Sequence, residues 1–333
     1  MKKTLLLSRA DVERFLTPEA CIAAVEDAFR AYGEGKVSPP GILGMRGGEG
    51  SFHVKAGFLT ADQPYFAAKV NANFPQNGPR YGLPTIRGAV ILFDAANGMP
   101  LAVMDSMSVT ALRTAAATAV AAKYLARERC HTLLLCGCGG QAQAQLQALL
   151  HVRSPARIYV YDQDPQKARS FAAALEAEIP VDVAPVTDLP GAASASDIIV
   201  TCTTARKYFI TLDMVRDGTF IAAVGADNED KQEIEPRLMA KATVVTDFSE
   251  QAATIGDLHH AIEAGAMKRE EVHAELGEVL AGRKRGRSTA EEIIIFDSTG
   301  TGLQDVAAAI AVYRRAQQEG LETGFDIGGR QAA

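Results

Sequence analysis

The chain has 333 residues, of which 47% are hydrophobic and 22% charged, and its net charge is −6. This composition is typical of a globular protein long enough for two domains, and its dispersed basic residues argue against nucleic acid or an anionic membrane as partner. No apolar run approaches the ~18 residues of a membrane span, and the N-terminus lacks a signal-peptide core. Five cysteines, an odd number without zinc-site spacing, favour a reducing compartment. We therefore expect a cytoplasmic enzyme without a bound metal.

The first third of the chain predicts one good helix followed by short strands. Thr17 and Pro18 form a cap and first turn, and the helix they open extends to about Gly33 with apolar residues at helical spacing. After it, Gly, Pro and Asn interrupt the pattern. Strands are predicted near residues 42–46, 51–58, 65–73 and 88–94.

A buried helix is predicted from Asp105 to Lys123, because small and apolar residues dominate it. Arg113 is the only charged residue between those two ends. A buried guanidinium needs an anion or another acceptor. Two alternatives remain for Arg113: an ion pair with a carboxylate of the same protein, or contact with a ligand.

A glycine-rich turn follows, and it organises the rest of the chain. The apolar strand 132–136 ends at Gly137. Gly137, Gly139 and Ala142 have G-x-G-x-x-A spacing, and a helix is predicted at 141–150. Gly137 permits the tight turn, and Gly139 lets the backbone approach a pyrophosphate at the helix N-terminus. A second strand, 157–161, ends at Asp162. A carboxylate there accepts hydrogen bonds from both ribose hydroxyls, which favours NAD over NADP.

Strands and helices alternate beyond the turn. Further strands are predicted at 181–185, 197–202, 219–225, 242–246 and 291–296, and a closing helix runs from Leu303 to about Gln318. This alternation indicates a doubly wound parallel sheet of the Rossmann type. Because ligands bind at the carboxyl ends of such strands, Thr201, Thr203, Thr204 and the segment 225–227 are candidate ligand contacts.

Four charged residues stand where simple solvent exposure is a poor explanation: Arg46, Lys69, Arg113 and Asp227. Three cations and one carboxylate beside a nicotinamide suit a small α-amino or α-imino acid. The cations would hold its carboxylate, Lys69 would relay a proton, and Asp227 would act as general base. Each of them has the alternative of a structural ion pair. His53 either faces the same cleft or is a satisfied rim residue.

With these residues in place, the chain resembles the ornithine cyclodeaminase/mu-crystallin family over nearly its whole length. The resemblance is carried by KVNANFPQN and GLPT (69–85), the segment 93–126, GCGGQA (137–142), VGADNEDKQEI (224–234), GEVLAG (277–282) and IFDSTGTGLQD (295–305). The family includes cyclodeaminases of ornithine and lysine, an archaeal-type alanine dehydrogenase and reductases of cyclic ketimines.

The resemblance implies roles for particular residues. Arg46, Lys69 and Arg113 would hold the substrate carboxylate with Thr299 nearby, and Asp227 would be the acid/base. The expected cofactor-binding residues are Thr85, Arg113, Thr114, Gly137, Gly139, Gly140, Gln141, Asp162, Thr203, Val224, Gly225, Lys231 and Ser298. The implied fold is an α/β protein with an NAD-binding Rossmann domain, residues 114–302. A second α+β substrate and dimerisation domain is built from both chain ends, 1–113 and 303–333, so we expect a homodimer.

Three functions follow from this reading. The leading one is an NAD(H)-dependent oxidoreductase that moves hydride between nicotinamide and the α-carbon of an amino or imino acid. A cyclodeaminase that uses NAD catalytically is the first alternative, and a non-catalytic small-ligand-binding protein like mu-crystallin is the second. The segment HVKAGF stands where ornithine cyclodeaminases carry a Glu for the distal ammonium of the substrate. Lys55 would repel a diamine there, which argues mildly against ornithine.

Overall fold

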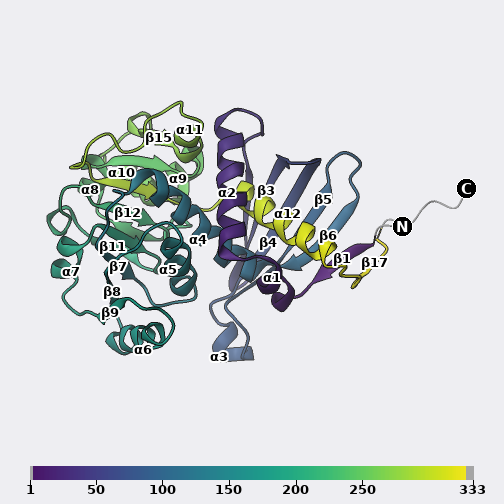
Figure 1. The fold of residues 1–333 in the computed structure, drawn as a ribbon, viewed down its shortest axis with the longest axis horizontal. Helices are drawn as coiled ribbons and strands as arrows, with labels where there is room; N and C mark the ends of the chain where they lie inside the picture. The colour runs from purple at the N-terminus through teal and green to yellow at the C-terminus, as the bar shows by residue number, and fades with distance from the viewer. Residues whose placement is uncertain (1–2, 328–333) are drawn as a thin grey trace, which may run out of the picture. The chain divides into compact units, whose positions relative to one another are not determined.

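The structure is a computed structural model that describes residues 3–327. The chain forms two compact units: unit 1 consists of Met1–Arg113 with Thr301–Ala333, and unit 2 of Thr114–Gly300. Unit 1 contains a mostly antiparallel sheet and unit 2 a parallel one (Figure 1). The predicted fold class, a Rossmann-type sheet plus a second α+β domain, is confirmed.

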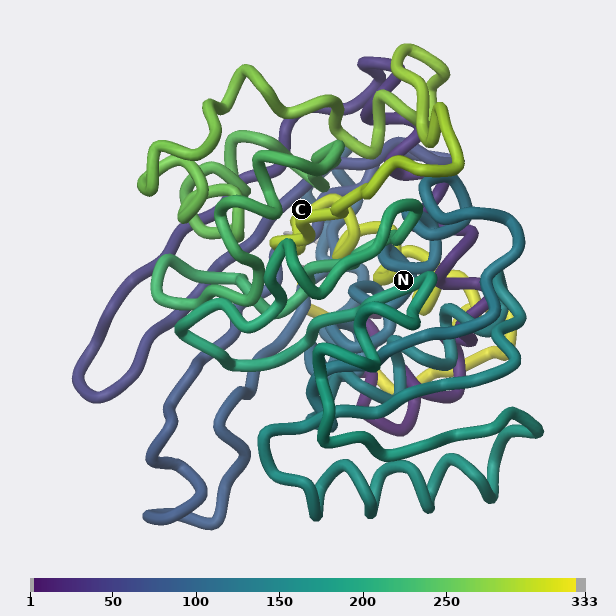
Figure 2. The backbone as a smooth tube through the Cα atoms, turned by 90° about the vertical axis from the view of Figure 1, so that its left-hand side faces the viewer, coloured from purple at the N-terminus to yellow at the C-terminus, as the bar shows by residue number. Residues whose placement is uncertain are grey.

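Unit 1 is built on a seven-stranded sheet in the order β17-β1-β6-β5-β4-β3-β2. Its strands are β1 (Thr4–Leu7), β2 (Gly41–Gly47), β3 (Gly50–Thr60), β4 (Pro64–Asn73), β5 (Ile86–Asp94), β6 (Pro100–Asp105) and β17 (Gly324–Phe325). Four of these were predicted. β1, β6 and β17 were not, and they lie side by side, with β1 parallel to β6 and antiparallel to β17. Figure 2 shows the β2–β3 hairpin and the β4–β5 connection as two long loops of the tube.

Helices cover one face of this sheet. Ser8 and Asp11 form a capping box on α1 (Arg9–Phe15), and Thr17 caps α2 (Pro18–Gly33), whose first residue is Pro18. A short α3 (Asn77–Tyr81) lies between β4 and β5. The closing helix α12 (Gly302–Gln318) packs on α2, β3 and β4 (Figure 1). Its first residue, Gly302, lies so near the backbone of Ala56 that a Cβ atom there would collide.

The register of the sheet separates its two faces. Residues directly opposite each other in antiparallel strands point to the same side. The face toward the helices carries buried Leu59, Val90 and Met104. The other face, which we call the outer face, is apolar as well, and Leu43, Met45, Phe52, Phe58 and Val70 are exposed on it.

Unit 2 contains an eight-stranded parallel sheet in the order β15-β14-β16-β12-β10-β7-β8-β9. Its strands are β7 (Thr132–Cys136), β8 (Arg157–Tyr161), β9 (Asp182–Pro185), β10 (Ile198–Thr201), β12 (Phe220–Ala223), β14 (Thr243–Thr246), β15 (Ala274–Glu275) and β16 (Ile294–Asp297). Counted among themselves, the six neighbouring strands β9-β8-β7-β10-β12-β16 have the order 3-2-1-4-5-6 of a dinucleotide-binding sheet. β14 and β15, which precede β16 in the chain, extend the sheet beyond it. Two small strands, β11 (Arg206–Ile210) and β13 (Gln232–Ile234), pair separately.

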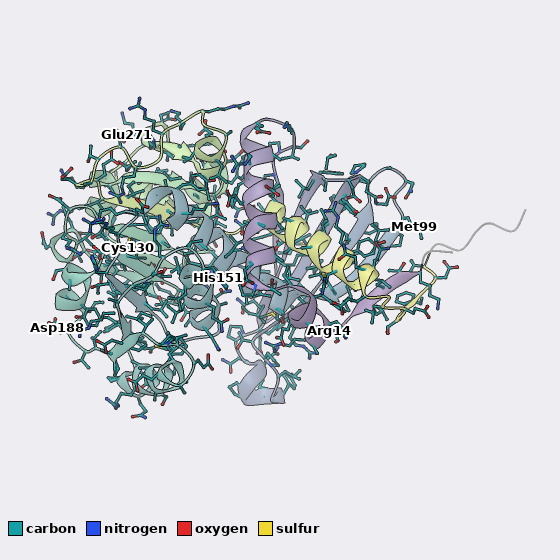
Figure 3. All side chains as sticks on the ribbon, in the orientation of Figure 1. Arg14, Met99, Cys130, His151, Asp188 and Glu271 are labelled. Carbon is teal, nitrogen blue, oxygen red and sulfur yellow. The ribbon has the colours of Figure 1, made fainter. Side chains whose placement is uncertain are left out.

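The connections of unit 2 are mostly helical. They are α5 (Ala142–Leu150), α6 (Pro165–Glu176), α7 (Leu189–Ala195), α8 (Pro236–Lys241), α9 (Ser249–Ile255), α10 (Asp257–Glu263) and α11 (Leu276–Leu280). Asp188, exposed and labelled in Figure 3, caps α7 by accepting the Gly191 N–H. The buried helix predicted at 105–123 is α4 (Ser106–Leu125), which begins in unit 1 and ends in unit 2.

Candidate active site

The glycine-rich turn connects β7 to α5 as predicted. Gly137 has a φ of 99°, and a Cβ atom there would lie 2.9 Å from the carbonyl oxygen of Cys202. The turn therefore requires glycine for both its backbone conformation and its packing. Around Gly139 and Gly140 the space is open, since a Cβ at either would meet nothing within 4 Å. A phosphate can approach the backbone there, at the N-terminus of α5.

Polar atoms near this turn fit a dinucleotide. Asp162 follows β8, and its Oδ2 accepts the Cys138 N–H at 2.9 Å, which holds the carboxylate beside the turn. Gln141 Oε1 and Ser298 Oγ are both buried and have no hydrogen-bond partner. Buried polar atoms are normally satisfied, so two orphaned ones among the predicted cofactor contacts indicate that a ligand supplies their partners. The open glycines, the orphaned atoms and the carboxylate after β8 fit the phosphate and ribose groups of NAD.

A buried carboxylate that the sequence analysis missed joins two further strand ends. Glu233 accepts hydrogen bonds from the backbone N–H of Thr203, after β10, and of Gly225, after β12. Burial raises the pKa of Glu233, while hydrogen bonds from Thr201 and Thr203 oppose the rise. In the sequence, Glu233 ends the polar and charged segment NEDKQE (228–233), which resembles a solvated loop. No local signal therefore marks Glu233 as buried.

Asp227 lies in the loop between β12 and β13. Its Oδ1 is 2.7 Å from Lys231 Nζ, and its side chain is 50% exposed, against 21% for Lys231. The predicted acid/base and a predicted cofactor contact therefore form an i,i+4 ion pair with each other. The pair is accessible enough to exchange partners when a ligand binds, because exposed ion pairs are weak.

Unit 1 contains a buried cluster of Lys69, Arg113 and Asp305. Lys69 Nζ and Arg113 Nε each lie 2.9 Å from Asp305 Oδ1, and Arg113 Nη1 donates to Gln304 Oε1 at 2.7 Å. Arg113 thus has a carboxylate of its own protein as partner, the first of the two alternatives. Asp305, at the start of α12, was not predicted as a site residue. Its Oδ2 is buried without a hydrogen-bond partner.

Burial and mutual charge shift the pKa values of Lys69 and Asp305 within the cluster. Burial, and then the charge of Arg113, lower the pKa of Lys69 from 10.5 to about 7, despite the opposing charge of Asp305. Burial would raise the pKa of the Asp305 carboxyl, but the charges of Lys69 and Arg113 hold it below its usual range. A lysine with a pKa near neutrality either accepts or donates a proton at physiological pH. The cluster therefore has the chemistry of a proton-transferring site as well as an anion-binding one.

Strand register brings other predicted residues to the same sheet face as this cluster. Lys55 on β3 is directly opposite Lys69 on β4, and it is buried. His53, one step along the same face, has its Nε2 3.0 Å from Ser51 Oγ. Arg46 on β2 is opposite Ser51 and exposed. The sheet face that carries the Lys69 cluster therefore also carries a row of basic residues, from Arg46 through His53 to Lys55 and Lys69.

The remaining predicted residues divide between the units. Thr85 is in unit 1, exposed just before β5, and its carbonyl accepts the Phe74 N–H. Thr114 is buried on α4 in unit 2. Thr299, also in unit 2, donates its hydroxyl to Asp247 at 2.9 Å. Val224, after β12, donates its N–H to the Thr201 carbonyl. The cations predicted to hold the substrate lie in unit 1, whereas Asp227 and the predicted cofactor contacts from Thr114 onward lie in unit 2.

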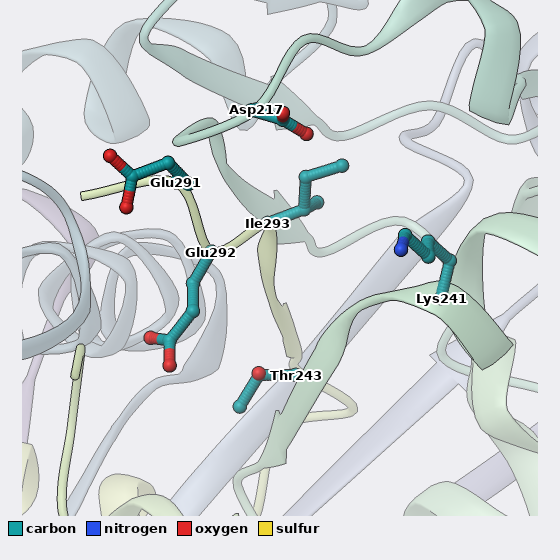
Figure 4. A pocket seen from close by; sticks show the side chains of 6 residues that line it. All are labelled: Asp217, Lys241, Thr243, Glu291, Glu292 and Ile293. Atoms are coloured by element: carbon teal, nitrogen blue, oxygen red, sulfur yellow. The ribbon is translucent and has the colours of Figure 1, made fainter. Parts of the chain in front are cut away.

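Two other features lie apart from these residues. A hollow in unit 2 lies at the amino ends of β12, β14 and β16, the sheet edge opposite the glycine-rich turn; it is lined by Asp217, Lys241, Thr243, Glu291, Glu292 and Ile293 (Figure 4). It is therefore not the ligand crevice of the parallel sheet. His259, His260 and Glu263 lie near one another on α10. His259 Nε2 lies 3.4 Å from Glu263 Oε2, and His260 donates a 2.9 Å hydrogen bond to the Lys231 carbonyl.

The strand order and the glycine-rich turn define a dinucleotide-binding α/β protein, and unit 1 contains a buried cluster of two cations that share one carboxylate. The chain belongs to the ornithine cyclodeaminase/mu-crystallin family, whose model matches residues 2–320. The expectation from the sequence motifs is confirmed.

Known proteins resemble the chain over nearly its whole length. The alanine dehydrogenase of Archaeoglobus fulgidus is 39% identical over 315 residues, 94% of this chain and 95% of that protein. The structure of an archaeal alanine dehydrogenase dimer with bound NAD has a TM-score of 0.93 and 37% identity, and the match covers 98% of this chain and 100% of that one. The Δ1-pyrroline-2-carboxylate reductase of Thermococcus litoralis, in complex with NADH and L-proline, has a TM-score of 0.90 and 33% identity, covering 97% and 100%.

Proposed function

We propose that the protein is an NAD(H)-dependent oxidoreductase acting between the α-carbon of a small α-amino or α-imino acid and nicotinamide. The observation that carries the proposal is the buried Lys69, whose pKa of about 7 makes it a proton donor or acceptor within an anion-binding cluster. The relatives support the class of reaction, since they include an alanine dehydrogenase and a reductase bound to NADH and L-proline.

The backbone of Gly139 and Gly140 would hold the dinucleotide at the glycine-rich turn, and Asp162 would bind its ribose. The dinucleotide would also supply hydrogen-bond partners for Gln141 and Ser298. When bound, NAD accepts a hydride from the substrate, and NADH donates one. The turn contributes backbone N–H groups and an uncrowded approach, and the carboxylate of Asp162 selects the free ribose hydroxyls of NAD.

The residues of this chain would divide the remaining work. Arg46 and Arg113 hold the substrate carboxylate, Arg113 through a guanidinium already fixed by Asp305. In the oxidative direction the amino nitrogen loses a proton as the α-carbon loses hydride, and neutral Lys69 takes that proton. In the reductive direction the ammonium form of Lys69 returns it. Asp227 acts as base toward the water that hydrolyses the imine.

We also propose that the protein is a homodimer joined through the outer face of the unit 1 sheet. Phe58, Phe66 and Phe93 lie side by side across three strands of that face, with tilted rings whose centroids are 4.9 Å apart for the first pair and 6.0 Å apart for the second. A broad apolar surface of this kind marks an interaction site. A second copy of the chain is the occupant we favour, because the archaeal alanine dehydrogenase it resembles is a dimer.

The cytoplasm is the compartment we propose for the enzyme. All five cysteines are free thiols, which fits a reducing environment. Across residues 3–327, the structure contains no helix of sufficient length and apolarity to cross a bilayer.

The test of function follows NADH absorbance while purified protein is incubated with NAD and a panel of α-amino acids, with ammonia measured in parallel. Stoichiometric NADH and ammonia from a monoamino acid support the dehydrogenase. Oxidation of NADH by a cyclic or acyclic imine supports the reductase direction. Ammonia from ornithine or lysine without accumulated NADH would instead establish cyclodeamination. Turnover that survives both Asp227→Asn and Lys69→Ala would refute the assigned roles.

A further inference from the structure

We propose that Glu233 is a positioning residue for NAD, which fixes the loops after β10 and β12 against the glycine-rich turn. The inference rests on the proposed binding of NAD and extends it to a residue below the ligand surface. Glu233 is fully buried and touches both loops through its carboxylate.

Four donors converge on this carboxylate. Oε1 accepts the Thr203 N–H at 2.7 Å and the Thr203 hydroxyl at 2.6 Å. Oε2 accepts the Thr201 hydroxyl at 2.6 Å and the Gly225 N–H at 2.8 Å. A backbone N–H only donates, so both oxygens must act as acceptors. An amide in place of the carboxylate would direct its NH2 group at a backbone N–H whichever way it turned.

The glycine-rich turn is packed against the first of these loops. A Cβ at Gly137 would lie 2.9 Å from both the Cys202 carbonyl and Thr203 Cγ2. Thr203 therefore lies directly against the glycine-rich turn, and a shift of Thr203 toward Gly137 would displace that turn. Thr203 is held in place by the two hydrogen bonds that it donates to Glu233.

The second loop is closed by the same side chain. The hydrogen bond from Gly225 to Glu233 joins the two ends of the segment 225–233, which carries Asp227 and Lys231. A Cβ at Gly225 would collide with the Glu233 carboxylate, so glycine is required where the carboxylate sits. The backbone of Glu233 is fixed in turn, because its N–H donates to Asp257 Oδ1 at 2.8 Å. The carboxylate thus sets the geometry of both loops from a rigid base.

The experiment measures NADH binding without substrate, by the change in NADH fluorescence on excitation of the nicotinamide. Glu233→Gln should raise the dissociation constant for NADH about tenfold, the effect of one unsatisfied donor. Glu233→Asp keeps the charge and should recover part of the affinity. The matched control is Glu235→Gln, two residues along, where the carboxylate accepts the Leu212 N–H and contacts neither loop. It should bind NADH as the wild type does.

Thermal unfolding of the ligand-free variants separates positioning from simple stability. A Glu233→Gln variant with a lower Tm but unchanged NADH affinity would overturn the inference and leave Glu233 a structural residue. If wild-type protein binds no NADH, the proposed function and this inference both fail. If the wild type binds and Glu233→Gln matches Glu235→Gln, only the inference fails. Should Glu233→Gln not fold, Gly225→Ala displaces the intact carboxylate, and an unchanged affinity there overturns the inference equally.

Discussion

Asp305→Asn tests whether the buried cluster of unit 1 is held by charge. Asp305 faces two cations at 2.9 Å, and both Lys69 and Asp305 are nearly inaccessible to solvent. The substitution keeps the size of the side chain and removes its charge. Both cations then lack their shared counter-charge, and Lys69, whose pKa is about 7, can lose its proton in response.

The expected loss in the free energy of unfolding follows from the burial of the two cations and from the ability of Lys69 to lose its proton. Removing one partner of a buried ion pair typically costs about 3–5 kcal/mol. Release of the Lys69 proton relieves part of the cost near neutrality, so we expect about 3 kcal/mol at pH 7. For a unit of this size that loss corresponds to a Tm lower by roughly 6–12 °C.

The pH dependence has a definite sign. The folded-state pKa of Lys69 is about 7, below its usual 10.5, and in the variant it falls further because the attracting carboxylate is gone. As the pH drops below 7, protonation of Lys69 costs the variant more than the wild type. The loss of stability should therefore grow from pH 8 to pH 6. Asp305 itself adds no slope there, since its pKa lies below 3.8 in the folded state.

Urea unfolding of the two proteins at pH 6, 7 and 8 measures these quantities. Asp62→Asn is the matched control, because Asp62 pairs with Arg314 of the same helix α12 but is 62% exposed. Its loss should stay below about 1 kcal/mol. If Asp305→Asn costs no more than the control, or its cost is the same at pH 6 and pH 8, the cluster is not the charged assembly described above.

Three further predictions concern the reaction, the cofactor and the assembly. Since neutral Lys69 accepts the proton in oxidation, oxidative kcat/KM should rise through pH 7 and reductive kcat/KM should fall; Lys69→Arg, which stays charged, should lose both inflections. Asp162→Asn should raise the KM for NAD roughly tenfold and lower that for NADP, and equal KM values before and after would exclude a ribose contact. Phe58→Asp on the outer face should convert a dimer to monomers in sedimentation, whereas Tyr208→Asp, at an exposed tyrosine of unit 2, should not.

The parts of the fold that depend on local sequence were predictable. The glycine-rich turn, the strands beside it and the cap at Thr17 are each specified by residues within a few positions of one another. β1 and β17 are short, and each forms only by pairing with a strand far away in the sequence. Nothing in the segment Thr4–Leu7 distinguishes a strand from a helix start, so its identity depends on β6, almost a hundred residues later.

The candidate site shows the same division between local and long-range information. Lys69 and Arg113 were identifiable because a charge amid apolar residues is conspicuous. Asp305 and Glu233 were not, since both stand near other polar residues in the sequence and become buried only by tertiary packing. The motifs 224–234 and 295–305 contain these two carboxylates, so the family resemblance marked the segments without marking the residues.

The net positive charge of the buried cluster bears on its proposed role in substrate binding and proton transfer. Lys69 and Arg113 share one carboxylate, so full protonation leaves an excess positive charge in a buried place. Burial first, and then the charge of Arg113, lower the pKa of Lys69. A substrate carboxylate would cancel that excess and raise the pKa of Lys69 again. Binding of an imino acid would then draw a proton onto the lysine, which prepares it as the acid that imine reduction requires. In the oxidative direction, Lys69 holds the proton taken from the substrate, and loss of the product carboxylate would release that proton. Binding and proton transfer are therefore linked through the same three side chains.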